Sequence, residues 1–431
     1  MTRLQAIVRT AAGWGRWLLS SPVRASLLVF TIAALVRLAI LFGTGSQGSD
    51  CKEACRVAMA IVQDGEFASP YAAPTGPTAH LPPFFPFLLS LLFGWLGAGL
   101  AGQTARCVIN VLAYSTLYGL MPWVADQLGL GRRAGFWAGL ILAAYPVHIS
   151  AEVHWGWDEA VAGMALAGMV VWTRRLWMRG WAPGWAAVTY GAAWGALYHS
   201  APSLLPSCVL LAVLAVAMAP RRGQAVRWWL AAGCAAVLVV MPWTLRNHAQ
   251  FGEWIFIRNN LGIELSQGFN DRAGFTMAEN KLSGAVMTHP TNDPEEAMRL
   301  KAMGGEIVYN RMLLHQTFDW IREHPRRAAW LMVGHGLAFW FGIGTGYRVV
   351  VAILTISSVL AWAAMILRLR RSQPVTSMVL LPFWVAYPAV YLFFQYVGRY
   401  RVAVDWSFFL VAAWGVLSFT GLGGDDGAER G

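Results

Sequence analysis

The sequence predicts an all-α polytopic membrane protein, a bundle of about ten to twelve transmembrane helices with an outer-face loop region. Of its 431 residues, 57% are hydrophobic and only 13% are charged, whereas soluble domains average about 25% charged residues. Apolar runs long enough to cross a bilayer as a helix recur along the chain. The polar–apolar alternation of a membrane β-barrel strand is missing from these runs.

The distribution of basic residues predicts the orientation of the chain in the membrane. The net charge is +11, but the arginines form short clusters between apolar runs, as the positive-inside rule describes. We therefore expect membrane lipid, and no nucleic acid, as a partner. The segments expected in the cytoplasm are the N-terminus with Arg3, Arg9, Arg16 and Arg24, then Arg132–Arg133, Arg174–Arg179, Arg221–Arg227 and Arg368–Arg371.

The same clusters decide which apolar runs cross the membrane completely. If 84–100 and 107–125 both crossed, Arg132 and Arg133 would lie outside, so we interpret 84–100 as an interfacial or re-entrant segment. By the same argument 327–343 is a helix that dips into the membrane. Ten full spans are then expected at about 25–43, 107–125, 134–150, 157–173, 184–199, 202–219, 228–245, 347–367, 376–396 and 402–421.

The polar stretch 247–325 is the one sizeable region predicted outside the membrane. We expect a short strand from Glu253 to Arg258 and a glycine-rich turn at 262–270. A helix should begin after Asp293, with Pro294 at its first position, and end at Gly304-Gly305 before a second helix at 306–323. The chain is thereby divided into an N-terminal transmembrane module, 1–246, with a first outer loop at 44–106, an extracytoplasmic loop region, 247–325, and C-terminal transmembrane helices, 326–431.

Cysteine and histidine patterns indicate no disulfide scaffold and no structural zinc. Three of the five cysteines lie in apolar runs, and we expect Cys51 and Cys55 in the first outer loop to be free thiols, a local disulfide being the alternative. The histidines show no metal-ligand spacing. Glycine-rich nucleotide-binding motifs are also missing, so a nucleotide-using enzyme is not expected.

Two acidic positions on the outer side are candidates for catalysis. Asp50 follows the first span at the lipid boundary, where a carboxylate is costly to desolvate. Asp158 stands in the second outer loop beside Glu159, and the alternative is that this pair only caps a helix. Paired carboxylates can divide labour between base and positioning group. We expect Glu53, Glu66 and Glu152 to be solvated loop residues.

Several arginines are candidates for binding a phosphate. Arg399 and Arg401 flank Tyr400 at the outer end of a span, against the usual charge bias, and guanidinium groups bind phosphate in a bidentate manner. Arg401 is the preferred candidate, and interfacial anchoring is the alternative. Arg37 lies inside the first span and should face a cavity or form a structural ion pair. Arg246 and Arg258 are weaker candidates at the mouth of the large loop.

The order of these motifs resembles the GT-C superfamily of membrane glycosyltransferases. After Asp50 come Pro82-Pro83-Phe84-Phe85-Pro86 and Asp158, and then Pro242-Trp243-Thr244-Leu245-Arg246-Asn247. Further along are Gly262, Leu265, Gly268 and Asn270, then His324-Pro325, and finally Arg399-Tyr400-Arg401. The resemblance is closest to the branch of protein O-mannosyltransferases and aminoarabinose transferases.

This resemblance implies an inverting transfer of sugar from a polyprenyl-phosphate donor to a lipid, glycan or protein hydroxyl on the outer face of the membrane. Asp50 would be the catalytic base or orient the acceptor, and Asp158 would be the second-loop acid. No cofactor is required, although Asp50 and Asp158 could hold a divalent cation through oxygen ligands. A bacterial inner membrane is the expected location.

Two other functions fit a polytopic chain. A transporter or lipid flippase would account for the many spans and an intramembrane arginine. Transporters, however, gather polar residues near the midplane and often contain two similar halves. Here the polar residues gather on one side and no repeat is visible. A non-catalytic scaffold with the same fold is the third possibility.

Overall fold

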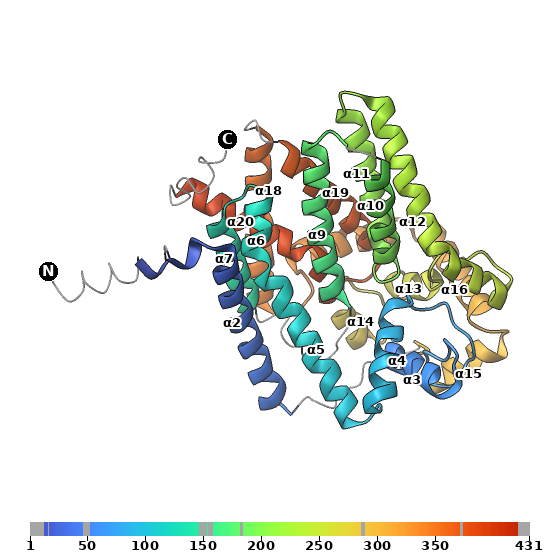
Figure 1. Ribbon diagram of the computed structural model, residues 1–431. Coiled ribbons are helices and arrows are strands. Elements are labelled where there is room, and N and C mark those ends of the chain that lie inside the picture. The colour runs from blue at the N-terminus through green and yellow to red at the C-terminus, as the bar shows by residue number, and fades with distance from the viewer. Residues whose placement is uncertain are drawn as a thin grey trace.

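The computed structural model describes residues 13–15, 17–45, 52–145, 153, 158–181, 184–285, 289–370 and 374–420. Throughout these residues the elements are helices, and the only extended pairings are two isolated bridges, Ala68 with Pro77 and Thr276 with Tyr396. The helices form one elongated bundle with a layer of shorter helices at one end (Figure 1). The predicted all-α polytopic class is confirmed.

Six helical segments of the described chain are long and apolar enough to cross a membrane. They coincide with six of the ten predicted spans. The segments are α2, Pro22–Gly43; α5 with α6, Leu100–Gln127; α12, Arg222–Phe251; α18, Arg348–Arg370; α19 with the 3-10 turn η3, Pro374–Phe393; and η4 with α20, Gly398–Phe419.

The other four predicted spans correspond to helices that do not meet these criteria. Three of them have 12, 15 and 14 residues, whereas a membrane crossing takes about 20. The fourth, α9, carries a carboxylate at its start and two arginines near its end. These helices are α7, Arg132–Ala143; α10, Gly184–Tyr198; α11, Leu205–Met218; and α9, Glu159–Met178.

The bundle is built around α20, whose residues from Val402 to Ala413 are all buried. It packs against α7, α9 and α18. Close helix contacts elsewhere depend on small residues, as in other membrane proteins. A Cβ atom at Gly191 of α10, for example, would lie 1.9 Å from the backbone oxygen of Ala232 in α12. Glycine at this position therefore sets the approach of α10 to α12.

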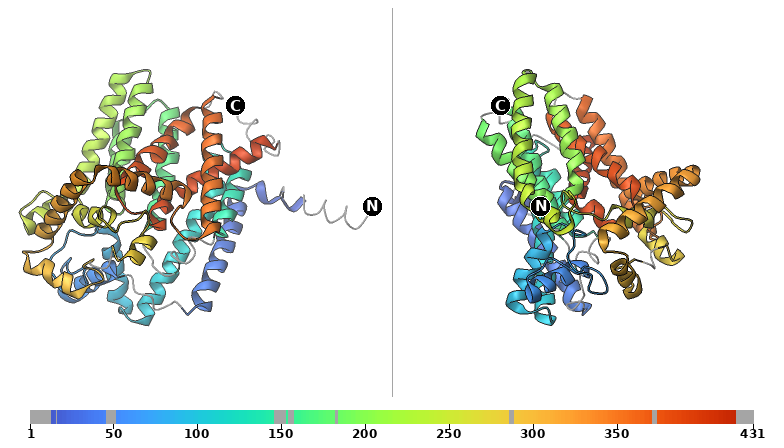
Figure 2. Two further views of the ribbon diagram at one scale, coloured as in Figure 1. Left: turned by 180° about the vertical axis from the view of Figure 1, so that it is seen from behind. Right: turned by 90° about the vertical axis from the view of Figure 1, so that its right-hand side faces the viewer.

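The shorter helices lie together at the end of the bundle away from the arginine clusters. The first outer loop contributes α3, Glu53–Asp64, and α4, Phe84–Leu96, which pack on each other. Figure 2 shows them beside the helices of the polar stretch, seen from behind and from the side. Those helices are α13, Leu261–Gly268; α14, Met277–Ser283; α15, Pro294–Ala302; and α16, Glu306–Glu323. The next helix, α17, Pro325–Phe341, corresponds to the apolar segment 327–343.

Capping chemistry correctly predicted part of this layer. The Asp293 carboxylate accepts hydrogen bonds from the backbone of Glu295 and Glu296, with Pro294 at the first position of α15. Gly304 and Gly305 adopt positive φ values of 103° and 95° and separate α15 from α16. Here local residue types were sufficient to predict the helix boundaries.

The predicted strand at Glu253 to Arg258 is wrong. Side chains of α12, and not a neighbouring strand, bind the carbonyl groups of this segment: Asn247 donates to Ile255 and Ile257, and Thr244 donates to Phe256. The predicted glycine-rich turn at 262–270 is also wrong, because most of it forms α13. A Cβ atom at Gly262 would lie 2.0 Å from the backbone oxygen of Asn310, so this glycine allows α13 to pack on α16.

The expectation of free thiols in the first outer loop is wrong for Cys55, which is disulfide-bonded. Cys107, Cys208 and Cys234 are free, as predicted. Cys51 lies outside the described residues.

Candidate active site

A polar cavity of about 120 Å³ lies where the first outer loop meets α9, α13, the end of α19 and η4. It collects ionisable and hydroxyl side chains from segments that are far apart in the sequence. These side chains are Glu53, His80, Asp158, Glu159, Ser203, Arg258, Glu264, Tyr387, Tyr391, Arg399 and Tyr400. Of the eight site residues predicted from sequence, four line this cavity: Asp158, Arg258, Arg399 and Tyr400.

The acidic wall of the cavity stands at the start of α9. Asp158 is the N-cap residue of this helix and Glu159 is its first residue, where exposed backbone N–H groups favour negative charge. The Ser200 hydroxyl donates a hydrogen bond to Asp158. Asp158 occupies the N-cap position, but its side chain makes no capping hydrogen bond to the backbone of α9 and lines the cavity instead.

The basic groups of the cavity are Arg258 and Arg399. Arg399 Nη1 lies 3.4 Å from Glu159 Oε1. Arg258 donates from Nε to Asn260 at 2.8 Å, and its Nη2 lies 3.5 Å from Glu264 Oε1. Each guanidinium group therefore has a carboxylate nearby, at a distance longer than a usual hydrogen bond, and both line the cavity.

Arg401, the preferred phosphate ligand from sequence, does not line the cavity. It is fully buried, with Nε 2.6 Å from Asp405 Oδ1, and Nη1 donates to the carbonyl oxygens of Phe339 and Trp340. The reason is local geometry, because Gly398–Arg401 forms the 3-10 turn η4. Successive side chains are about 120° apart in such a turn, so residues 399 and 401 point to different sides. Arg399, the other arginine of the motif, does line the cavity, and phosphate binding at this motif stays a prediction.

Arg37 and Arg246 are also engaged elsewhere and line neither cavity described here. Arg37 donates to the carbonyl groups of Leu142 and Ala143, at 3.3 and 3.0 Å, and so caps the last turn of α7. Arg246 donates to Thr78 and Phe67 of the first outer loop, at 2.7 and 2.9 Å. For Arg37 the sequence predicted a cavity or a structural ion pair, whereas these hydrogen bonds go to backbone carbonyls. Arg246 also donates to the side-chain oxygen of Asn247 at 3.1 Å.

Glu53 was expected to be a solvated loop residue, and this expectation is wrong. Its side chain is 15% exposed, accepts a hydrogen bond from the Thr291 hydroxyl, and lies 3.6 Å from His80 Nε2. Burial raises the pKa of the Glu53 carboxyl, but the hydrogen bonds and charges of His80, His289 and Thr291 outweigh it, so the pKa lies well below its usual range. Glu66 is exposed, as predicted. Asp50 and Glu152 lie outside the described residues.

Sequence reasoning missed His80 and Glu264 as cavity residues. Neither stands in a motif with recognisable spacing. His80 belongs to the first outer loop and Glu264 to α13, and the fold brings them together at the cavity. Glu159 could have been found, because it follows Asp158 directly at the start of the same helix.

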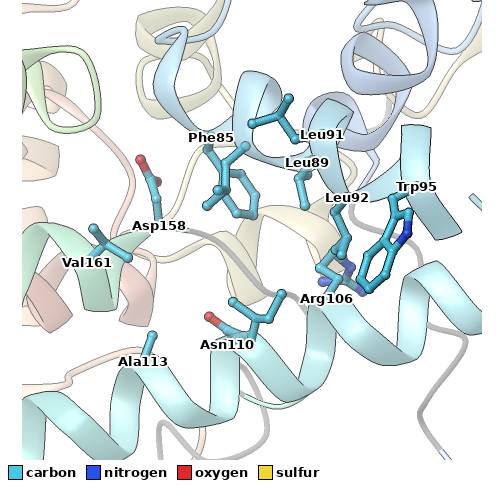
Figure 3. Close-up of a pocket in the computed structure, with 12 residues that line it drawn as sticks. Phe85, Leu89, Leu91, Leu92, Trp95, Arg106, Asn110, Ala113, Asp158 and Val161 are labelled. Atoms are coloured by element: carbon cyan, nitrogen blue, oxygen red, sulfur yellow. The ribbon is translucent and has the colours of Figure 1, made fainter. Parts of the chain in front are cut away.

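A second, apolar cavity of about 280 Å³ adjoins the first. Figure 3 shows it between α4 and α5, with Trp95 towards one end and Asp158 towards the other. Its wall consists mainly of aliphatic and aromatic side chains from α4, with Arg106 and Asn110 of α5 as polar members. Phe85 and Asp158 line both cavities, so they mark the junction between an apolar and a polar compartment.

Among the described residues, no group of three His, Cys, Asp or Glu side chains is arranged to hold a metal ion. Asp158, one of the two predicted oxygen ligands for a divalent cation, lines the polar cavity, and the other, Asp50, is not described. Cation binding stays a prediction.

No family model and no curated protein matches this chain. Solved structures do match. An archaeal oligosaccharyltransferase, AglB from Archaeoglobus fulgidus in complex with an inhibitory peptide and a dolichol-phosphate, aligns with a TM-score of 0.54 and 14% identity over 92% of this chain. The apo form gives 0.53 at 13% identity, and the form tethered to an acceptor peptide gives 0.52 at 14% identity, each again over 92% of this chain.

The chain has the fold of this oligosaccharyltransferase. It covers 51% of the first two structures and 50% of the third, so it spans about half the length of the proteins it matches. The expected resemblance to GT-C glycosyltransferases is confirmed at the level of the fold. The particular branch, O-mannosyltransferase or aminoarabinose transferase, stays a prediction.

Proposed function

We propose that this protein transfers a sugar from a polyprenyl-phosphate donor to a hydroxyl group of a lipid, glycan or protein acceptor on the outer face of a bacterial inner membrane. The observation that carries the proposal is the pair of adjoining cavities that share Phe85 and Asp158. A polyprenyl-phosphate sugar has the same two parts, an apolar chain and a charged head, joined at one phosphate.

The apolar cavity fits the isoprenoid end of such a donor. It is walled by α4, which exposes Leu91 and Trp95 at 74% and 83%, and a surface of this kind is stable in lipid. The chain could therefore enter sideways from the membrane while its phosphate head passes the junction into the polar cavity, towards Arg258 and Arg399.

The polar cavity supplies the groups that glycosyl transfer requires. As the glycosidic bond breaks, negative charge grows on the lipid phosphate, and Arg258 and Arg399 would stabilise it. A carboxylate on the other side would orient the acceptor hydroxyl for in-line attack on the anomeric carbon. Asp158 is available for this within the cavity, and Asp50 is the further candidate from sequence.

The matching oligosaccharyltransferase structures contain a dolichol-phosphate in one case and an acceptor peptide in another. These ligands support a polyprenyl donor, and they add a peptide to the acceptors that should be tried. At 13–14% identity, the likeness to these structures concerns the fold.

The experiment is a transfer assay with purified protein in lipid nanodiscs. Radiolabelled polyprenyl-phosphate mannose, glucose, N-acetylglucosamine and aminoarabinose would be offered with lipid, glycan and peptide acceptors. We expect label to move from at least one donor to an acceptor, and both Asp158→Asn and Asp50→Asn to lower the rate about 10²-fold or more. Translocation of the donor across the bilayer without transfer would instead establish a flippase and reject the proposal.

A further inference from the structure

His80 is a buried imidazole in the wall of the polar cavity, and only one of its two nitrogens faces a charged group. Its side chain is 2% exposed, and its Nε2 lies 3.6 Å from the Glu53 carboxylate. Among the residues that the structure describes, no group hydrogen-bonds to the buried Nδ1. A buried nitrogen without a partner is costly. Because His80 lines the cavity, a substrate hydroxyl that gains access to Nδ1, whose own surface is covered in this structure, would supply the missing partner.

The backbone around His80 is held in place by a chain of buried hydrogen bonds. The amide of His80 donates to the Thr78 hydroxyl at 3.0 Å, and this hydroxyl donates to Glu306 at 2.6 Å. Glu306 also accepts from the amide of Ala79. Because Glu306 is the first residue of α16, the outer layer fixes the position of His80 from a different part of the chain.

Glu53 is held just as firmly on the other side of the imidazole. It is the first residue of α3 and accepts a hydrogen bond from Thr291. The segment carrying Thr291 is tied to α3 again, because Arg56 donates to the Thr291 carbonyl at 3.0 Å and Lys52 donates to Asn292 at 2.7 Å. An ionised carboxylate in this position favours a proton on Nε2, which leaves the lone pair on Nδ1.

We propose that His80 is the general base of this cavity, with Glu53 as the residue that orients it and stabilises its charged form. The proposal rests on the proposed function and names the proton acceptor for that reaction. A carboxylate on one nitrogen of an imidazole and a substrate hydroxyl on the other is the arrangement by which histidine activates hydroxyl groups in unrelated folds. Asp50 and Asp158 would then orient the acceptor instead of taking its proton.

In the step proposed here, the acceptor O–H bond breaks and its proton moves to His80 Nδ1. The electron pair of the acceptor oxygen forms the new bond to the anomeric carbon. The bond from that carbon to the phosphate oxygen breaks, and its electron pair stays on the lipid phosphate. The imidazolium ion formed on His80 is stabilised by Glu53, which stays ionised, and later releases its proton to solvent.

Other titratable groups around His80 contribute to its pH dependence. His289 lies with its ring centroid 6.3 Å from that of His80, and Tyr71 lies at 5.1 Å. Burial lowers the pKa of His289, so it is neutral near pH 7. Glu306 is close enough to interact with the charge of His80. The titratable groups that surround His80 are thus Glu53, Glu306, His289 and Tyr71.

The test is the rate of sugar transfer between pH 5 and 8.5 for wild type, His80→Gln, His80→Ala and Glu53→Gln, with the donor that the wild type uses. Imidazole would be added to His80→Ala to fill the space left by the side chain. His315→Gln serves as the matched control, because His315 is exposed on α16 away from the cavity. Thermal unfolding in detergent would show that each variant remains folded.

If His80 is the base, His80→Gln should lower kcat about 10²-fold or more with little change in KM for the donor. The fall in rate at acid pH should disappear, and imidazole should restore part of the activity of His80→Ala. Glu53→Gln should lower kcat less than His80→Gln does, and the fall in its rate at acid pH should begin at a lower pH than in wild type. His80→Gln activity within threefold of wild type, or an unchanged acid limb without rescue by imidazole, would overturn the proposal.

Failure of the wild type itself to transfer sugar from any donor would reject the proposed function instead. If the His80 variants do not fold, the comparison of wild type with Glu53→Gln still decides the matter. If the rate falls at the same acid pH in both proteins, the Glu53–His80 pair does not act as the general base.

Discussion

At the scale of single residues, the difference between Arg399 and Arg401 shows what sequence spacing can and cannot predict. Two arginines around a tyrosine at the end of a span correctly indicated a site for charge. Which arginine faces the cavity depends on the 3-10 turn of η4, and no residue type in the motif specifies that turn. The partner of Arg401, Asp405, lies four residues further along, in α20, and the sequence analysis did not predict this ion pair.

Replacement of these two arginines should give opposite phenotypes. Arg399→Ala should raise the donor concentration needed for half-maximal rate about tenfold or more, since a charge-assisted hydrogen bond contributes about 1.5–3 kcal/mol. The protein should remain folded, because Arg399 is partly exposed in the cavity. Arg399→Lys should recover only part of the loss, because a point charge lacks the bidentate fork.

Arg401→Ala should instead destabilise the protein by about 3–5 kcal/mol, because Asp405 would be left buried without its partner. Thermal unfolding of both variants in one detergent, alongside the transfer rate at several donor concentrations, distinguishes the two effects. Equal unfolding temperatures with a donor defect in Arg401→Ala would show that the assignment to Arg399 is mistaken.

Glu53 leads to a prediction about pH and stability. Its pKa in the folded protein is below the ordinary value, so its contribution to stability is fully present above about pH 4.3 and is lost as the pH falls towards the folded pKa. Glu53→Gln should therefore unfold at a lower temperature than wild type at pH 7, and the difference should shrink below about pH 4. A difference that is constant with pH would mean that the carboxylate charge makes no contribution.

At the scale of helices, the sequence was most informative where one residue type determines a boundary. Asp293 with Pro294, and Gly304 with Gly305, predicted the limits of α15 because capping and positive φ are local requirements. Residues 253–258 were misread as a strand because their carbonyl partners, Asn247 and Thr244, lie on α12. His80 was missed for the same reason, since its neighbours Glu53 and His289 come from other parts of the chain.

Gly262 provides a test of the packing of α13 on α16. Gly262→Ala should destabilise the protein by about 1–3 kcal/mol, because the new Cβ atom would lie 2.0 Å from the backbone oxygen of Asn310. Gly223→Ala is the matched control, since a Cβ atom there meets nothing within 4 Å and alanine favours a helix. Comparable unfolding temperatures for the two variants would show that α13 and α16 are not in close contact.

At the scale of the whole molecule, the apolar runs and the arginine clusters were sufficient to predict a helical membrane bundle with its polar layer at one end. They overestimated how many helices meet the length and hydropathy of a full span. The reason is length, because α7, α10 and α11 have 12, 15 and 14 residues, fewer than the about 20 that a crossing takes. Hydropathy alone does not separate a short packed helix from a crossing one.

The orientation of this bundle is the last prediction, and it decides on which side of the membrane the two cavities open. Leu282 is 91% exposed on α14 in the outer layer, and Arg222 is exposed at the opposite end, at the start of α12. In a Cys234→Ser background, which removes the exposed free thiol, Leu282→Cys in intact cells should react with a membrane-impermeant maleimide. Arg222→Cys should react only after permeabilisation. Because α12 runs from Arg222 to Phe251, just before the outer layer, the reverse pattern would place the cavities on the cytoplasmic side and contradict the orientation predicted from the arginine clusters.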